Sequence, residues 1–287
     1  MTAGSLLSRN ARRKGLNGFM LGLCALFAFF TVSTLFVILG FLLYNGATSV
    51  SLNFFTKLPL PPGQDGGGMA NAILGSAQIV IVATAIGLPI GFFAGIYLAE
   101  YGGKAFAFIV RYVADLLNGI PSIVIGIVAW TVVVVPQHHF SALAGSLALS
   151  LMLIPITARN TEQFLLEVPR SMREGSLALG ANKWRTIAMV IVPAARKGIM
   201  TGMILGVARI SGETAPLLFT SLNNQYFSTG LSEPTASLPV MIFQRAISPF
   251  DDYHRQAWAA GLVLLALVLL ANIAARMVIS RGTSLPR

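Results

Sequence analysis

Six long apolar runs dominate the chain, and five of them contain no Asp, Glu, Lys or Arg. A helix needs about 20 apolar residues to cross a bilayer. The runs of this length are Phe19–Tyr44, Ile73–Ala99, Leu116–Val135, Phe140–Ala158, Gly198–Thr220 and Ala257–Ala275. Lipid cannot hydrogen-bond to backbone groups, so such runs form helices or closed barrels, and their length favours helices. We therefore predict an all-α polytopic membrane protein with six transmembrane helices.

Basic residues in the predicted loops indicate the orientation of these helices, because cytoplasmic loops carry an excess of Lys and Arg. With the N-terminus inside, sixteen Lys and Arg fall in cytoplasmic segments, three fall outside, and Arg209 lies in the membrane. Both termini are therefore predicted to be cytoplasmic, in a bacterial inner membrane. The same distribution accounts for the net charge of +10. No basic domain or stripe is present, so we predict no nucleic-acid partner.

Several other classes of site are not expected. The first apolar run is longer than the 7–15 residues of a typical signal-peptide core, so we predict that it stays as a span. The single cysteine, Cys24, excludes an intrachain disulfide. His138 and His139 have no Cys, Asp or Glu beside them and are interpreted as solvated, not as metal ligands. The chain has no GxxxxGK[ST] motif, so we predict no ATP site of its own and no enzymatic activity.

Local sequence adds detail to the spans and loops. Gly119 and Pro121 open the third run, which predicts either a kink against a neighbouring helix or an unwound turn facing a cavity. In the fifth run, glycines every fourth residue predict close helix–helix packing; these are Gly198, Gly202 and Gly206. The predicted external loops are 45–72, an irregular connection, and 222–255, a possible cap over the outer mouth.

The stretch 174–193 lies in a predicted 39-residue cytoplasmic loop, Arg159–Lys197. Its apolar and small residues predict an amphipathic helix, and Gly180 and Ala181 predict its end or a turn. Lys183 starts a second helical piece, and Pro193 is expected to break the pattern before the membrane. A helix–turn–helix of this kind suits docking of a partner or contact with the lipid surface.

This stretch resembles the coupling motif shared by permease subunits of ABC importers, in which Glu-Ala-Ala is followed by Gly and later by an aliphatic-Pro pair. Here the small residues at the second and third positions are Gly and Ser. The resemblance implies an ABC importer permease fold whose coupling helix docks on a separate ATPase. The residues that would form this coupling segment are Glu174, Gly175, Ser176, Leu177, Ala178, Gly180, Ala181 and Pro193.

A second group of polar residues lies inside the fifth apolar run. Arg209 and Glu213 are four residues apart, which places them on one face of a continuous helix. A charge in the bilayer costs at least about 2.5 kcal/mol, so such residues usually face a protein interior or a wet path. The planar guanidinium also matches a tetrahedral oxyanion. A purely structural Arg–Glu pair is the alternative interpretation. Gly212 and Pro216 are expected to weaken the helix at this point.

The run Arg-Ile-Ser-Gly-Glu-Thr-Ala-Pro-Leu, residues 209–217, resembles a signature of the permeases of bacterial high-affinity phosphate importers. Residues 96–101, 118–126 and 238–242 also resemble that family, and together they favour one of its two permease types over the sister permease, PstC. The resemblance spans about residues 70–276. It implies that the substrate pathway includes Arg209, Glu213, Ser211 and Thr214.

The same resemblance implies partners and a division of the chain. The expected partners are the sister permease PstC, two copies of the ATPase PstB, the phosphate-binding protein PstS, inorganic phosphate and membrane lipid. ATP would be bound by the ATPase subunit, and this chain would need no cofactor. The expected domains are an N-terminal tail (1–18), a permease domain (19–279, with the coupling segment at about 170–195) and a C-terminal tail (280–287).

Three alternatives remain open at this stage. A permease for another oxyanion, such as sulfate, molybdate or phosphonate, would share the coupling motif. An ion-coupled secondary transporter would need no ATPase, and Glu213 would be its natural proton site. A non-transporting assembly or signalling subunit would leave the Arg209–Glu213 pair purely structural.

Overall fold

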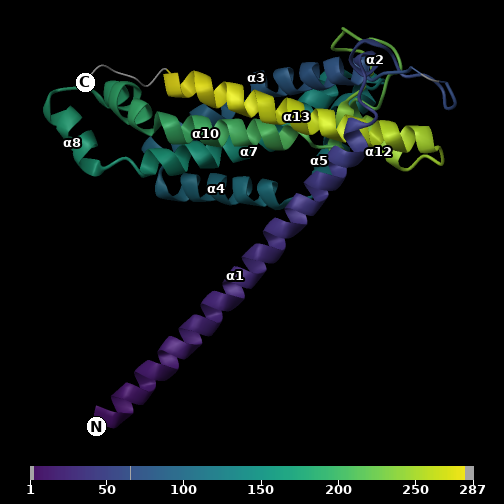
Figure 1. Ribbon diagram of the computed structural model, residues 1–287. Helices are drawn as coiled ribbons and strands as arrows, with labels where there is room; N and C mark the ends of the chain where they lie inside the picture. Colours follow the sequence, from purple (N-terminus) through teal and green to yellow (C-terminus); the bar gives the residue numbers. More distant parts are fainter. Residues whose placement is uncertain (1–2, 65, 282–287) are drawn as a thin grey trace.

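The computed structural model describes residues 3–64 and 66–281, which form helices joined by turns and loops with no strand among them (Figure 1). The helices are α1 (Ala3–Ala47), α2 (Leu52–Thr56), α3 (Ala70–Glu100), α4 (Lys104–Gly119), α5 (Ser122–Ala129), α6 (Val135–Gln137), α7 (Ala142–Leu166), α8 (Arg170–Ala178), α9 (Lys183–Thr186), α10 (Val192–Ser211), α11 (Ala215–Thr220), α12 (Leu238–Ala246) and α13 (Asp251–Arg281). Two π-helical turns, η1 (Trp130–Val134) and η2 (Ile187–Ile191), complete the described elements.

Five stretches are long and apolar enough to cross a membrane. They are Arg13–Ala47, Ala70–Glu100, Ala142–Leu166, Lys183–Ser211 and Asp251–Met277. A sixth is present if the bent pair Ala105–Gly119 and Ser122–Gln137 counts as one span. The predicted all-α polytopic architecture is therefore confirmed. Helix α1 begins at Ala3, so the described part of the predicted N-terminal tail is helical and continues into the first span. The C-terminal tail from residue 282 lies outside the described residues.

The helices differ from the predicted uninterrupted runs in three places. The third apolar run contains the break expected at Gly119 and Pro121, because α4 ends at Gly119 and the chain bends by 103° before Ser122. The fifth run is interrupted after Ser211, next to Gly212, where a weakened helix is expected. The predicted loop 159–197 is mostly helical, since α7 continues to Leu166 and α9 begins at Lys183.

Pro193 does not break the helix, contrary to expectation. A proline inside a helix lacks the N–H for one hydrogen bond and its ring clashes with the carbonyl one turn earlier. Here the π-turn η2 ends two residues before Pro193, and the helix continues into α10. The same arrangement occurs at Pro136, where η1 ends two residues before the proline. A π-turn shifts the hydrogen-bond register by one residue, so it accommodates the proline within a continuous helix.

Helix α7 lies at the centre of the bundle and packs against α3, α4, α5, α10 and α11. The predicted glycine ridge on α10 is confirmed: Cβ atoms added at Gly198, Gly202 and Gly206 would meet side chains of α7. A second ridge was not predicted: Gly87, Gly91 and Gly95 bring α3 against the other flank of α7. Small residues at both surfaces let the backbones approach closely, as helices in lipid require.

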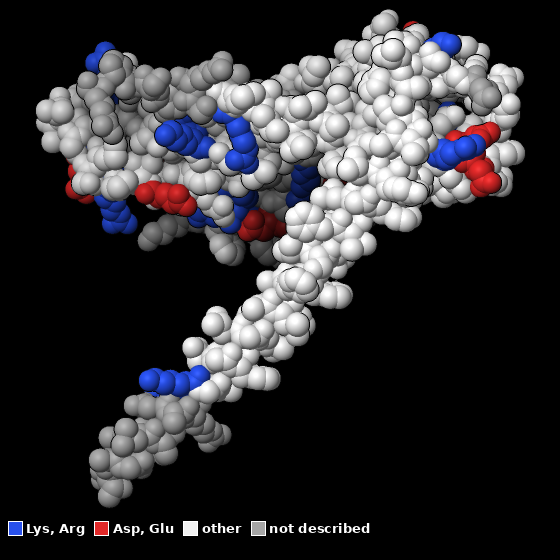
Figure 2. Space-filling view, in the orientation of Figure 1, with Lys and Arg blue, Asp and Glu red and all other residues white. Residues whose placement is uncertain are grey.

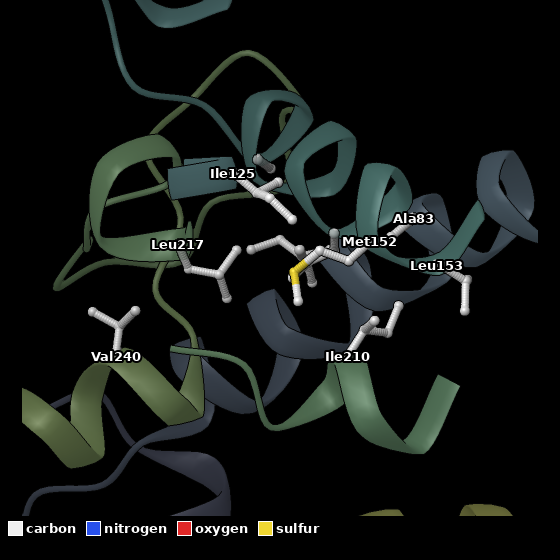
Figure 3. Close-up of a cluster of buried hydrophobic side chains, with 10 residues drawn as sticks. Ala83, Ile125, Met152, Leu153, Ile210, Leu217 and Val240 are labelled. Carbon is white, nitrogen blue, oxygen red and sulfur yellow. The ribbon is translucent and has the colours of Figure 1, made fainter. Parts of the chain in front are cut away.

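The main core joins α7 to the residues on both sides of the break in the fifth run. Ile210 lies in the last turn of α10, before the break, and Leu217 lies in α11, after it; both side chains are buried. Figure 3 shows both side chains directed toward Met152 of α7, with Ile125 of α5 beside them. The core therefore fixes the position of the interrupted segment between α10 and α11.

The bundle has two ends that differ in structure, called here the α8 end and the α12 end (Figure 1). Charged side chains lie over the half of the bundle toward the α8 end, and a smaller group lies near the α12 end (Figure 2). Helix α1 leaves the bundle near the α12 end and projects away from it. None of the residues in its most apolar stretch is buried.

Candidate functional site

The signature run 209–217 forms a helix break and not a continuous helix. Helix α10 ends at Ser211, Gly212 lies at its C-terminus, and α11 starts at Ala215. The predicted weakening at Gly212 and Pro216 is therefore confirmed. Pro216 occupies the first turn of α11, where its missing N–H is not needed.

Arg209 is exposed on α10, and in the described part of the chain it has no ion pair and no hydrogen bond from its side chain. It follows Lys197, the previous cation on the same helix, by twelve residues, which corresponds to about 18 Å of helix rise. The intervening residues are uncharged. Since a hydrocarbon core is about 30 Å thick, Arg209 lies well inside it when Lys197 is at the membrane surface.

Glu213 does not share a helical face with Arg209, so that prediction is wrong. The helix ends two residues before Glu213, whose backbone N–H donates to the Ile210 carbonyl at 3.2 Å. No ion pair joins the two side chains within the described residues. The guanidinium and the carboxylate are thus separate polar groups on the two sides of a break, and the structural-pair interpretation loses its main support.

The two hydroxyl residues of the predicted pathway lie in different surroundings. Ser211 is about 200° around the helix from Arg209, and its Oγ donates to the Val207 carbonyl at 2.7 Å. It lines a largely apolar groove between α10 and α13, away from Arg209. Thr214 caps α11, and its carbonyl accepts from the N–H groups of Leu217 and Leu218 at 3.1 and 3.2 Å.

Residues of α5 support the break directly. A Cβ atom added at Gly126 would lie 2.7 Å from Cα of Pro216, so only glycine lets α5 contact α11 this closely. Gly126 ends the run 118–126, and Pro216 belongs to the run 209–217. These two sequence motifs, ninety residues apart, therefore form one packing unit in the structure.

The predicted coupling segment is a helix followed by a turn, as expected. Helix α8 ends at Ala178 and Gly180 adopts a left-handed conformation, with φ of 82°. The Gly180 N–H donates to the Leu177 carbonyl at 2.9 Å and the Ala181 N–H to the Ser176 carbonyl at 3.2 Å. This is the Schellman arrangement, in which glycine is favoured because it has no Cβ.

Polar contacts hold this segment to the end of α3. Arg173 of α8 pairs with Glu100 and also donates to the Leu165 carbonyl at 2.5 Å. Lys183 of α9 donates to the Glu100 carbonyl and lies 4.1 Å from the centre of the Tyr101 ring. A 2.9 Å hydrogen bond between the hydroxyls of Ser176 and Thr186 closes the turn.

The opposite surface of the segment is exposed and partly apolar. Leu179, at the tip of the turn, is 91% exposed, and Met172, Leu177 and Trp184 are also exposed. Glu174 and Gly175 are exposed on α8. Pro193 is outside this surface, within α10. An exposed apolar tip on a firmly held turn is typical of a surface that a partner covers.

Sequence reasoning missed a buried carboxylate near the α8 end. Glu162 of α7 is 1% exposed and pairs with Arg111 of α4 at 2.5 Å and with Arg159 at 2.6 Å. Arg159 also pairs with Asp115 at 3.0 Å. Arg159 and Glu162 fall in the predicted loop 159–197 because the helical continuation of α7 beyond Ala158 carries charges. The available signal was the i, i+3 spacing of Arg159 and Glu162.

The comparison with protein families decides the assignment. Residues 87–282 match the family described as "Binding-protein-dependent transport system inner membrane component". The Yersinia pestis protein called "Phosphate transport system permease protein PstA" is 49% identical to this chain, over 83% of this chain and 81% of that protein. The Haemophilus influenzae protein of the same name is 46% identical, over 92% of this chain and 94% of that protein. The chain belongs to this family, among the PstA permeases. It is accordingly a multi-pass inner-membrane protein.

Solved structures agree with this family at the level of fold. The inward-facing MetNI methionine ABC transporter contains a chain similar to this PstA-family protein, with a TM-score of 0.59 and 19% identity, over 75% of this chain and 97% of that one. A chain of an amino acid ABC transporter solved with histidines gives a TM-score of 0.53 at 14% identity, over 75% and 91%. The ABC importer permease fold expected from the coupling motif is therefore confirmed.

Proposed function

We propose that this chain is the permease of an ATP-driven phosphate importer and forms half of its translocation pathway. The observation that carries the proposal is the exposed Arg209, which has no ion pair among the described residues and lies at a helix break within an otherwise apolar stretch. Its guanidinium offers several N–H donors to a tetrahedral oxyanion. The curated PstA proteins, named as phosphate transport permeases, support phosphate as that anion.

The surface around Arg209 needs a polar cover in the membrane. An unpaired charge facing lipid costs at least about 2.5 kcal/mol, whereas a charge at a wet interface between two permeases does not. This supports a sister permease, PstC, as the other half of the pathway. The phosphate-binding protein PstS would deliver substrate from outside.

The exposed surface of α8 and its turn supports docking of an ATPase, PstB, present in two copies. Leu179 would enter a groove of the ATPase, and the ion pair between Arg173 and Glu100 would transmit its movement to α3. In this proposal the α8 end and both termini face the cytoplasm. ATP would be bound by the ATPase and not by this chain.

Transport in this direction requires an energy source. Moving a phosphate dianion into a cell with a negative interior costs about 4.6 kcal/mol for each 100 mV, before any concentration gradient. Phosphate would replace water at Arg209 when the outer side opens. Glu213, which does not pair with Arg209, would act in gating or desolvation, because a carboxylate beside a dianion repels it.

The test is uptake of labelled phosphate into proteoliposomes containing this chain with its candidate partners, with ATP supplied or withheld. Sulfate, molybdate and phosphonate are added as competitors. We expect ATP-dependent phosphate uptake that sulfate does not inhibit. Uptake of another oxyanion would refute phosphate selectivity. Uptake that ignores ATP but collapses with a protonophore would refute coupling to an ATPase.

A further inference from the structure

A cavity of about 310 Å³ lies at the α12 end and is lined by residues outside the signature run 209–217. It lies between the loop that contains Pro59 and Leu60, helix α12 and the start of α13. Its lining residues are Pro59, Leu60, Pro61, Pro62, Asn223, Gln225, Met241, Gln244, Arg245, Ser248 and Tyr253, with no carboxylate among them. A cavity of this size far exceeds the roughly 10–15 Å³ that one water requires.

Among the described residues of this lining Arg245 is the only charged one, and it is 5% exposed. Its guanidinium donates to Oε1 of Gln256 and lies 4.3 Å from the centre of the Tyr253 ring. In the described part of the chain no Asp or Glu lies within 4.0 Å of it. Asp252 pairs instead with Arg255 at 2.5 Å, and Asp251 lies 3.9 Å from His254.

Burial without a counterion makes this cation unusual. Desolvation lowers the pKa of Arg245, and the nearby Tyr253 opposes that effect only in part. Buried charges in proteins are normally paired or fully hydrogen-bonded. A guanidinium has five N–H donors, and Gln256 is the single hydrogen-bond acceptor found for it in the described residues. The remaining donors are available to an acceptor in the cavity.

The neighbouring polar groups are also placed to donate. Asn223 Nδ2 donates to Oε1 of Gln244 at 2.6 Å, which leaves the amide N–H groups of Gln244 without an acceptor in the described residues. The Ser248 hydroxyl lies in the same lining. Tyr253 directs its hydroxyl to the Leu60 carbonyl at 3.4 Å, so it holds the covering loop over Arg245. A cavity with a buried cation, neutral donors and no carboxylate suits an anion.

We infer that this cavity is a binding site for a small phosphate-class oxyanion, separate from Arg209 and held by Arg245, Gln244 and Ser248. That the anion is free phosphate on its way into the pathway rests on the proposed function. The phosphate headgroup of a lipid offers the same chemistry. The two sources are separated in the experiment.

The experiment uses the complex of this chain with its partner permease and ATPase in phosphatidylcholine nanodiscs, carrying Arg209→Gln to remove the pathway cation. Binding of ³³P-labelled phosphate is measured by equilibrium dialysis. We expect saturable binding that Arg245→Gln and Gln244→Leu each weaken about tenfold or more, since hydrogen bonds to charged groups contribute this much. The matched control is Arg255→Gln, an exposed arginine of the same region outside the cavity, which should bind as before.

Two results would overturn the inference. One is the absence of saturable phosphate binding in the Arg209→Gln complex. The other is binding unchanged by both cavity substitutions. If Arg245→Gln prevents assembly, Gln244→Leu alone decides, because its side chain is only partly buried.

A further arm repeats the titration in phosphatidylglycerol nanodiscs. Phosphate binding that is retained in these nanodiscs supports free phosphate as the ligand. Phosphate binding that is lost only in these nanodiscs would overturn free phosphate as the ligand and assign the cavity to a lipid headgroup. Binding at this cavity is measured without transport, so a complex that binds phosphate here but imports another anion would refute the proposed function and leave this inference standing.

Discussion

Arg209 is exposed and lies within an apolar stretch, and its side chain has no ion pair or hydrogen bond among the described residues. We predict that Arg209→Gln abolishes phosphate uptake while the complex still assembles, because the pathway loses the donors that replace phosphate hydration. The measurement is uptake in proteoliposomes, with assembly checked by size-exclusion chromatography. Arg196→Gln, which changes an exposed arginine two residues before the start of the apolar part of α10, should leave uptake intact. Normal uptake by the Arg209 variant would contradict the assigned role.

Glu162 is a buried charged residue with a structural role, because it pairs with two arginines. We predict that Glu162→Gln lowers stability by about 3 kcal/mol, because Arg111 and Arg159 would lose their shared buried partner. Thermal unfolding of the purified protein measures this loss. Glu167→Gln is the control, since Glu167 is exposed at the end of the same helix. An unchanged unfolding temperature for Glu162→Gln would show that the two arginines are satisfied by water.

At the level of elements, the close contact between α3 and α7 depends on glycine. A Cβ atom at Gly91 would lie 2.6 Å from Cβ of Thr157 and 2.8 Å from the Ile154 carbonyl oxygen. We predict that Gly91→Ala destabilises the protein by about 1–3 kcal/mol through overpacking. Gly22→Ala in α1 meets nothing within 4 Å and should be neutral or stabilising. Equal unfolding temperatures for the two variants would count against the packing argument.

The helices also show which structural features can be predicted from the sequence alone. Long apolar runs in the sequence locate the six predicted spans, because a helix must be apolar to cross lipid. They do not give the ends of helices that continue into charged residues, as α7 does at Glu162. The prediction for Pro193 is wrong because the π-turn that accommodates the proline has no local sequence signal. Spacing along the chain also cannot reveal tertiary packing, such as the contact between Gly126 and Pro216 or the burial of Arg245 without a carboxylate partner among the described residues.

At the scale of the whole molecule, the proposed coupling to ATP hydrolysis depends on the exposed turn after α8, which has Leu179 at its tip. We predict that Leu179→Asp prevents the ATPase subunit from co-purifying and abolishes ATP-dependent uptake, because a carboxylate replaces the apolar group that would be buried on docking. The control is Tyr226→Asp, an exposed residue in the loop before α12. Retained co-purification of the ATPase with the Leu179 variant would exclude this tip as the docking point.

The projecting α1 has a consequence for how the chain is made. In the described residues its substantial contact is with α13, where Phe41 meets Trp258 at 5.3 Å between ring centres and Gly46 lies against Leu262. These partners are 217 and 216 residues apart in the sequence, so at about 5–20 residues per second a ribosome reaches α13 some ten to forty seconds after α1 is complete. Helix α1 therefore remains without this intrachain partner until α13 has been made.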